Sequence, residues 1–464
     1  MTSEGASSQG ASSQGASSQG ASGRRPAGPR RPPLADMADP AVLPDPYPML
    51  AKLREASPFT EFDGAMVVVG GYADCSRILR DPLVSSERNR SLLAPAGLPR
   101  AQSFLSLDPP DHTRLRRLVS KAFTARVVAA LGPRIRSLAD ELLTAAGPDG
   151  PGDTDRPSGT DGAADSGGTD RPGGADCSGR RAGELEVVSQ LAYPLPVRII
   201  SELLGVPVAD RQRFAGWSAR LAHALQPQFG PVDPAAGIAA EQARVEFAGY
   251  FRELIALRRA RPAPDLLSEL IRAEDEGERL TEEELIATCV LLLVAGHETT
   301  VGLISNAILA LLRHPDQLAA LRADPGLAGD AVEETLRYDP PVQLTARIAR
   351  GIRQVGGLRP ADGAVLMLLL AATGRDPEEF ADPDRFDIRR DAAGHLAFAA
   401  GPHFCLGAPL ARLEATITLQ AFAARVAGPA LDAARLVYKP NFNLRGPQRL
   451  IVSYANIRPA VHTA

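Results

Sequence analysis

Cys405 has the setting of a metal ligand. It stands in the segment Phe398-Ala-Ala-Gly-Pro-His-Phe-Cys-Leu-Gly407, at the start of a helix that we expect over residues 405–426. The first-turn amides of a helix have no partner inside the helix, and with the positive end of the helix dipole they favour a thiolate. Thiolates ligate metals; the alternative is one buried cysteine at a helix start, because free cysteines are among the most buried residues.

An acidic residue and two threonines interrupt the most apolar stretch of the chain. They lie in Ala295-Gly-His-Glu-Thr-Thr300, within an expected helix over residues 281–312 that begins with a capping-box signature. Gly296 costs a helix about 1 kcal/mol relative to alanine. A helix crossing at Gly296 would explain the glycine structurally. The functional interpretation is a ligand beside the helix, with Thr299 donating and accepting hydrogen bonds and Glu298 exchanging protons with water.

Two pairs of charged residues each lie on one helix face. His112 and Arg116 are four residues apart, and Glu334 and Arg337 are three apart. Taken alone, the first pair is typical of a solvated basic helix, and the second is a common ion pair that stabilises a helix by about 0.2–0.5 kcal/mol. Two neighbouring cations can also bind carboxylates, since arginine does so in a bidentate way.

The elements that must position these residues are mostly helical. Apolar periodicity and capping signals predict helices over residues 110–123, 125–145, 185–204 with a break at its two prolines, 235–261, 281–312, 329–337 and 405–426. Short β-rich segments predict strands over residues 63–69, 347–352 and 364–369. The fold class predicted is mostly α with small β-sheets, or α+β.

Two segments have biased composition. Residues 5–19 are three copies of Gly-Ala-Ser-Ser-Gln, and Arg and Pro follow to about residue 33, so we expect residues 1–35 to be a disordered low-complexity tail. Residues 147–183 are rich in Gly, Asp, Ser, Thr and Pro, and we expect a disordered insertion on a surface loop. One domain over residues 36–464 remains.

Composition excludes several classes of protein. The 464 residues carry a formal net charge of −4, which gives no electrostatic reason to expect a nucleic-acid partner. The four cysteines form no CxxC pair, which favours a reducing cytoplasm over a disulfide scaffold. No run of about 18 apolar residues and no signal-peptide core is visible, so we expect a cytoplasmic protein without a membrane span.

The segment around Cys405, followed by Ala408-Pro-Leu-Ala-Arg412, closely resembles the haem-binding loop of the cytochrome P-450 family. The resemblance implies that the cofactor is haem b, iron protoporphyrin IX, and that Cys405 is its axial ligand. Phe398 would pack against the haem near the ligand, and His403 would reach a propionate. Gly407 would let the backbone approach closely, because it has no Cβ.

The run Ala295–Thr300 resembles the oxygen-activation motif of the same family. By this resemblance Thr299 orients dioxygen and water, and Glu298 relays protons. The same resemblance implies that three residues face the substrate: Leu291, Val294 and Ala295. Relatives that couple phenols sometimes lack the threonine, so its presence favours oxygen insertion.

The charged pairs also match the family. His112 and Arg116, together with Arg347 in Leu344-Thr-Ala-Arg347, resemble the residues that bind the haem propionates. Glu334 and Arg337 resemble the Glu-x-x-Arg helix, which would form a buried structural triad with Arg385. That triad would serve the fold and haem incorporation rather than the chemistry.

The resemblance as a whole implies the triangular cytochrome P-450 fold and a haem-thiolate monooxygenase. The expected reaction inserts one atom of dioxygen, by hydroxylation or epoxidation, into a bulky apolar small molecule, a secondary metabolite. Electrons would come from a ferredoxin and a ferredoxin reductase. The alternatives are an oxidative phenol- or aryl-coupling enzyme, a peroxide-driven haem oxidase, and a non-enzymatic haem carrier or sensor. The carrier or sensor predicts loss of Glu298 or Thr299, and both are present.

Overall fold

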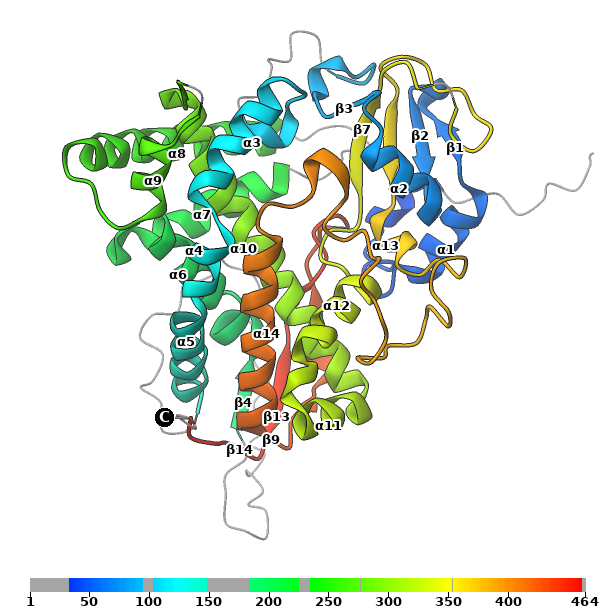
Figure 1. The fold of residues 1–464 in the computed structure, drawn as a ribbon. Helices are drawn as coiled ribbons and strands as arrows, with labels where there is room; N and C mark the ends of the chain where they lie inside the picture. Colours follow the sequence, from blue (N-terminus) through cyan, green and yellow to red (C-terminus); the bar gives the residue numbers. More distant parts are fainter. Residues whose placement is uncertain are drawn as a thin grey trace, which may run out of the picture.

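The protein is described by a computed structural model over residues 33–94, 103–147, 183–224, 234–275, 277–352 and 354–460. Figure 1 shows a large helical part beside a smaller part, in which the blue strands β1 and β2 and the yellow strand β7 form a sheet next to α1 and α2. This arrangement confirms the prediction of a mostly helical protein with small sheets.

The helices account for most of the described chain. They are α1 Tyr47–Ala56, α2 Tyr72–Arg80, α3 Asp111–Ala122, α4 Ala125–Ala130, α5 Gly132–Ala145, α6 Pro194–Leu203, α7 Arg211–Ala224, α8 Pro234–Ala260, α9 Leu266–Arg272, α10 Glu282–Arg313, α11 Pro315–Ala323, α12 Ala328–Tyr338, α13 Leu370–Thr373 and α14 Ala408–Arg425. The helix predicted over residues 185–204 is partly wrong. Its first residues belong to strand β4, because they pair with β13 near the C-terminus, and α6 begins only at Pro194.

The largest sheet has the strand order β1-β2-β8-β7-β3. Its strands are β1 Phe59–Glu61, β2 Met66–Val69, β3 Val84–Ser85, β7 Thr345–Ala349 and β8 Val365–Leu368. β2 and β8 run parallel and are buried along their whole length, as expected for strands covered on both faces. A second sheet joins β10 Ala430–Leu431, β13 Ile451–Tyr454 and β4 Gly183–Glu186. β11 Val437–Tyr438 pairs with β12 Pro447–Arg449, β9 Val426–Ala427 with β14 Asn456–Ile457, and β5 Glu274–Asp275 with β6 Glu278–Arg279.

The long helix α10 is the central element of the helical part. Its N-terminus has the predicted capping box, in which Thr281 Oγ1 accepts from Glu284 N and the Glu284 carboxylate accepts from Thr281 N. By length and composition α10 could cross a membrane, but 61% of its most apolar window is buried inside the protein. It packs against α6, α8, α12 and α14, so its apolar surface is used by the core.

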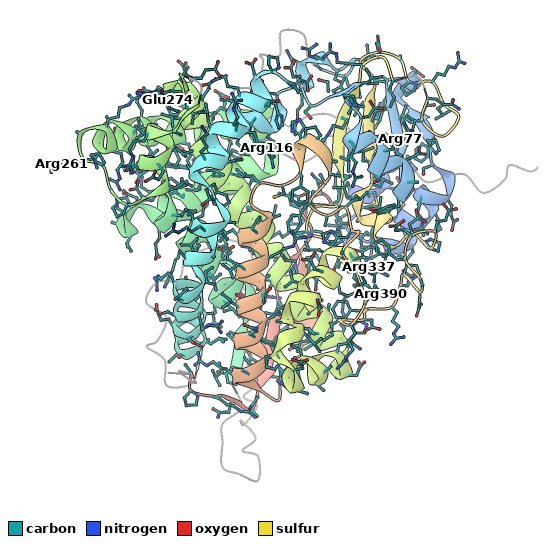
Figure 2. All side chains as sticks on the ribbon, viewed as in Figure 1. Arg77, Arg116, Arg261, Glu274, Arg337 and Arg390 are labelled. Atoms are coloured by element: carbon teal, nitrogen blue, oxygen red, sulfur yellow. The ribbon has the colours of Figure 1, made fainter. Side chains whose placement is uncertain are left out.

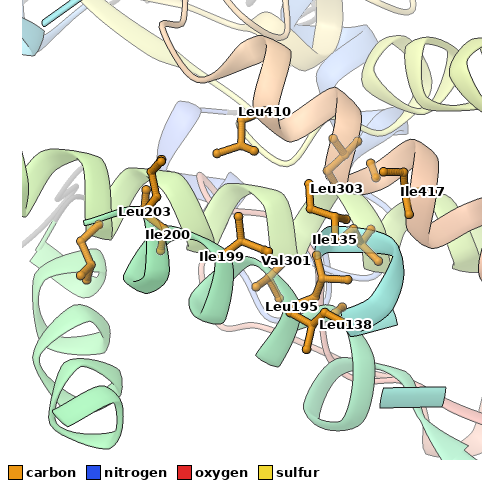
Figure 3. Close-up of a cluster of buried hydrophobic side chains, with 14 of the residues drawn as sticks. Ile135, Leu138, Leu195, Ile199, Ile200, Leu203, Val301, Leu303, Leu410 and Ile417 are labelled. Carbon is orange, nitrogen blue, oxygen red and sulfur yellow. The ribbon is translucent and has the colours of Figure 1, made fainter. Parts of the chain in front are cut away.

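A buried apolar cluster fixes α10 relative to α14. Figure 3 shows side chains from α5, α6, α10 and α14 meeting in this cluster: Ile135, Leu138, Leu195, Ile199, Ile200, Leu203, Val301, Leu303, Leu410 and Ile417. Because burying each aliphatic side chain contributes about 1.5–3 kcal/mol, the two helices are held rigidly. The start of α14, where Cys405 lies, is thereby placed relative to Glu298 and Thr299.

Both segments predicted to be disordered lie almost wholly outside the described residues. At the edge of the predicted tail, Leu34 is fully buried in a 3₁₀ helix, Leu34–Ala38. At the end of the predicted insertion, Gly183 is the first residue of β4, and a Cβ there would lie 2.4 Å from the Tyr454 ring. The described domain therefore begins and resumes at residues that are packed into the core.

The Arg337 guanidinium is the centre of the structural ion-pair network. Arg337 and Glu334 are both fully buried, and Arg337 Nε and Nη2 donate to the two Glu334 oxygens at 2.7 and 2.8 Å. Its remaining N–H groups donate to the carbonyl oxygens of Gly374, Pro383 and Arg385. All five donors of the guanidinium are therefore satisfied, which a buried charge requires.

The prediction that Arg385 is the third member of this triad is wrong. Its side chain is 61% exposed and pairs with Asp387 at 3.4 Å, and only its backbone carbonyl contacts Arg337. Arg390 takes the place instead, with Nε 3.4 Å from Glu334 Oε1 and 15% of its side chain exposed. Figure 2 shows Arg337 and Arg390 together beside α12. The loop that carries both arginines places Arg390, rather than Arg385, beside the buried Glu334 carboxylate.

We expect Arg337→Met to lower the free energy of unfolding by about 3–5 kcal/mol, because it leaves the Glu334 carboxylate buried without its main partner. Arg385→Met should change this free energy by less than about 0.5 kcal/mol, as is usual for an exposed side chain. Denaturant titration of the two variants measures both values. Equal destabilisation by the two substitutions would contradict the assignment.

Candidate active site

The loop before α14 holds Cys405 in a fixed position. Cys405 N donates to Phe398 O at 3.0 Å, and a short 3₁₀ helix, Gly401–His403, lies between them. Gly401 has φ +69°, and a Cβ there would lie 2.4 Å from Leu79 O. Only glycine fits such a left-handed position with so close a contact. The hydrogen bond from Cys405 N to Phe398 O and the close contact at Gly401 therefore fix this loop, and the thiol lies just before the first turn of α14.

The thiol of Cys405 does not ionise readily by itself. Burial raises the pKa of Cys405, and the amides of Gly407 and Ala408 with the charges of Arg116 and Arg412 only partly oppose this. The helix N-terminus therefore favours the thiolate, as the sequence suggested, but does not outweigh burial by itself. A metal cation does, because it deprotonates a coordinating thiol outright. A Cβ on Gly407 would lie 3.9 Å from Cys405 Sγ, which is an ordinary contact, so the close approach expected for this glycine stays a prediction.

Four basic residues gather near this loop: His112 and Arg116 on α3, Arg347 on β7 and His403 before Cys405. We call them the basic cluster. The rings of His112 and His403 lie 4.1 Å apart, and Arg116 Nη2 donates to Phe404 O at 2.5 Å. Figure 2 shows Arg116 between α3 and the loop that precedes α14. The structure thus brings together all four residues that the sequence predicted for the propionates.

Burial disfavours the charged forms of the basic cluster, and among the charges that act on it Asp108 opposes this for His112 and Arg347. Burial lowers the pKa of Arg347 to about 10, and burial with the charges of Arg347, His112 and Arg116 lowers the pKa of His403 to about 3. His112 is 3% exposed, and neither of its ring nitrogens has a hydrogen-bond partner in the described chain. Asp108 acts on His112 and Arg347, but its carboxylate is already bonded to Ser85 and Ser86. The cluster is built to receive anions.

Phe398 is held by two neighbouring side chains near Cys405. The Arg412 guanidinium lies 4.7 Å from its ring centroid, and the Phe404 ring lies 6.3 Å away. Arg412 in turn donates to both oxygens of Glu333 at 2.7 and 2.8 Å. Phe398 is therefore fixed close to Cys405, although what its free face contacts stays a prediction.

The predicted motif on α10 presents its polar groups in different directions. Thr299 Oγ1 donates to Ala295 O at 2.8 Å, and Thr300 Oγ1 donates to Gly296 O at 3.0 Å.

A Cβ on Gly296 would come no closer than 3.5 Å to Ile200, which is an ordinary contact. The packing against α6 therefore does not require glycine at this position, so a helix crossing does not explain it.

The Glu298 carboxylate lies between Lys439 and His297. Lys439 Nζ donates to Oε2 at 2.9 Å, and His297 Nε2 lies 3.5 Å from Oε1. Burial raises the pKa of Glu298, but His297 and Lys439 outweigh it and bring the pKa to about 2. Sequence reasoning missed Lys439, since it lies 141 residues from Glu298 in the chain.

The three residues predicted to face the substrate do not share one environment. Ala295 is exposed although α10 is mostly buried, and Leu291 is partly exposed one turn earlier. Val294 is 7% exposed and belongs to the core. Leu291, Ala295 and Thr299 are spaced by four residues and so lie along one face of α10. That face, rather than Val294, is open to a ligand.

The residues present fit a haem group. Cys405 would bind its iron, and the basic cluster would bind its two propionates. The His112 ring nitrogens, which have no hydrogen-bond partner among the described residues, agree with such a group.

Comparison with known proteins identifies the family. The family model "Cytochrome P-450" matches residues 235–325 and 327–424. The chain is 42% identical over 429 residues to the cytochrome P-450 monooxygenase PikC of Streptomyces venezuelae, covering 90% of this chain and 92% of PikC. The chain belongs to the cytochrome P-450 family.

Two further relatives are similar over most of their length. The cyclomarin C epoxidase CymV of Salinispora arenicola is 38% identical over 387 residues, covering 82% of this chain and 89% of CymV. The ligand-free crystal structure of CYP164A2 from Mycobacterium smegmatis has a TM-score of 0.77 and 43% identity, covering 90% of this chain and 98% of that one. The predicted cytochrome P-450 fold is confirmed. This chain is a haem-thiolate monooxygenase whose cofactor is haem b.

We expect Arg347→Leu to weaken haem binding, because a charged hydrogen-bond donor to a carboxylate is worth about 1.5–3 kcal/mol, or roughly 10- to 150-fold in affinity. The rate of haem transfer to an excess of an acceptor protein measures this loss. Arg385→Leu, at an exposed position, is the matched control and should leave the rate unchanged. An unchanged rate in Arg347→Leu would remove Arg347 from the haem site.

Proposed function

We propose that this enzyme hydroxylates or epoxidises a bulky apolar small molecule, a secondary metabolite. The observation that carries the proposal is the packing of α10, which bears Glu298 and Thr299, against α14, which starts directly after the loop of Cys405 and beside the basic cluster. The names of relatives agree with oxygen insertion, since PikC is a monooxygenase and CymV an epoxidase. Leu291 and Ala295 give the open face its apolar character.

In this proposal Cys405 is the axial ligand, and His112, Arg116, Arg347 and His403 bind the propionates. Haem bound through a thiolate supplies dioxygen binding and cleavage of the O–O bond. Phe398 and Gly407 shape the space around the sulfur. Because the loop is closed by the Cys405 N to Phe398 O hydrogen bond, the sulfur keeps its position when the group binds.

In this proposal Thr299 and Glu298, on α10, deliver protons to the oxygen. Thr299 Oγ1 uses its hydrogen on Ala295 O, so its lone pairs remain free to accept a hydrogen bond from water or from the oxygen being reduced. Glu298 is a carboxylate, and it takes up a proton at one of its oxygens and passes it on. Ala295 and Gly296 keep the helix narrow where the substrate and oxygen must fit.

The electron donor in this proposal is a ferredoxin, which is reduced by a ferredoxin reductase. Phe404 is 40% exposed directly before Cys405, so the chain reaches the surface next to the sulfur. Arg116 borders the same place through its hydrogen bond to Phe404 O. Basic residues at such a rim accelerate association with an acidic partner. We place the catalytic domain at residues 36–464 and the protein in the cytoplasm.

We expect Thr299→Ala to keep haem and its spectrum but to lower the ratio of product formed to reductant consumed by about tenfold or more, since general acid–base catalysis is worth about 10²–10⁴. Thr300→Ala is the matched control, because Thr300 is buried and its hydroxyl serves only the Gly296 carbonyl. The ratio should be close to that of the unmodified enzyme in this control.

Labelled dioxygen then tests the reaction class with any compound that shifts the ferric haem spectrum on binding. Oxygen insertion requires one labelled atom in the product. A product without label, formed at the same rate, would favour oxidative coupling and contradict the proposal.

A further inference from the structure

The partner of Glu298 comes from a distant part of the chain. Lys439 directly follows β11, in the hairpin that β11 forms with β12, and its Nζ lies 2.9 Å from Glu298 Oε2. The two side chains are 22% and 16% exposed. The ion pair is thus largely shielded from water, and a shielded pair is weakened little by salt.

Two glycines bring this hairpin onto α10. Gly302 lies one helical turn after Glu298, and a Cβ there would be 2.8 Å from Pro341 Cβ and 2.9 Å from Arg445 O. A Cβ on Gly446 would lie 3.2 Å from Gly302 Cα. Lys439 N donates to Gly446 O at 3.1 Å, so the lysine is tied to the contact. Any side chain at position 302 would push the hairpin, and Lys439 with it, away from the helix.

The other groups around Glu298 do not supply a fixed positive charge. His297 Nδ1 lies 2.6 Å from Leu293 O and therefore carries hydrogen, so Nε2, 3.5 Å from Glu298 Oε1, stabilises the carboxylate only while the ring is protonated. Tyr193 faces the same region from the turn before α6; burial and the charge of Glu298 raise the pKa of Tyr193 to about 12, so the phenol stays neutral. Lys439 is the permanent cation of the group.

We propose that Lys439 is a positioning residue of the proton relay, which fixes the direction and the charge of the Glu298 side chain from the C-terminal hairpin. This inference rests on the role proposed above for Glu298. Without the ammonium, a carboxylate in this shielded place would have no cation to hold Oε2, and burial would favour its protonated form. Lys439 thereby makes the hairpin part of the active site.

The pH profile of coupling tests the proposal. In the unmodified enzyme Glu298 stays charged between about pH 5 and 8, because its pKa lies near 2. In Lys439→Met the Glu298 pKa should rise, because only His297 would then oppose burial, and only while its ring is protonated. The ratio of product to reductant should then change with pH between about 4 and 7, where the unmodified enzyme shows no such step.

Lys439→Arg is the conservative variant and should restore the flat profile, because arginine keeps the charge but cannot lose its proton. A flat profile in Lys439→Met would overturn the proposal. A step that persists in Lys439→Arg would overturn it as well, because the ammonium would then be a proton donor rather than a fixed charge.

A second readout is independent of turnover. The chain contains three lysines, Lys52, Lys121 and Lys439, so isotope-labelled lysine gives three side-chain NMR signals in the reduced, CO-bound holoenzyme. Glu298→Gln should shift the Lys439 signal and leave that of Lys52 unchanged. An unshifted Lys439 signal would contradict the ion pair.

The two proposals fail in different ways. If Glu298→Gln leaves coupling unchanged, the relay role of Glu298 is wrong, whatever Lys439 does. If Glu298→Gln uncouples the enzyme while Lys439→Met keeps the unmodified pH profile, only the role of Lys439 is wrong.

Discussion

The packing of α10 against α14 is the constraint on which the rest of the structure depends. α10 carries Glu298 and Thr299, and α14 starts directly after the loop of Cys405. Apolar side chains from both helices meet those of α5 and α6 in one buried cluster. Because protein interiors are close-packed, such a cluster permits little relative movement. The separation of the two chemical sites is therefore set by aliphatic packing rather than by the polar residues themselves.

Electrostatics explains why the same region binds a charged cofactor. The basic cluster joins four cationic or potentially cationic side chains. Burial lowers the pKa of Arg347, and burial together with neighbouring positive charges lowers the pKa values of its two histidines. Leaving such groups buried and unpaired is costly. The two carboxylates of haem b would relieve this cost when bound by the basic cluster, and its iron would favour the thiolate of Cys405. The carboxylates of the cofactor thus compensate the positive charge of the basic cluster, and Lys439 compensates the negative charge of Glu298.

Local motifs made much of this site predictable from the sequence. The segment around Cys405, the run at Glu298 and Thr299, and the pair His112 and Arg116 each lie within a few residues, so their spacing alone indicates a shared face or loop. The structure then gathers His112, Arg116, Arg347 and His403 as expected. The prediction of the third triad residue was wrong because Arg385 and Arg390 lie in one irregular loop. Such a loop has no helical or strand periodicity that would indicate which side chain points inward. Lys439 and the pairing of β4 with β13 depend on contacts between distant segments, which spacing does not report.

The central claim is that Cys405 ligates haem iron as a thiolate, and the absorption spectrum of the reduced, CO-bound protein tests it most directly. The unmodified protein should show the strongly red-shifted Soret band of a thiolate complex, and Cys405→Ser should lose that band while the fold is kept. A red-shifted band that survives in Cys405→Ser would contradict the account.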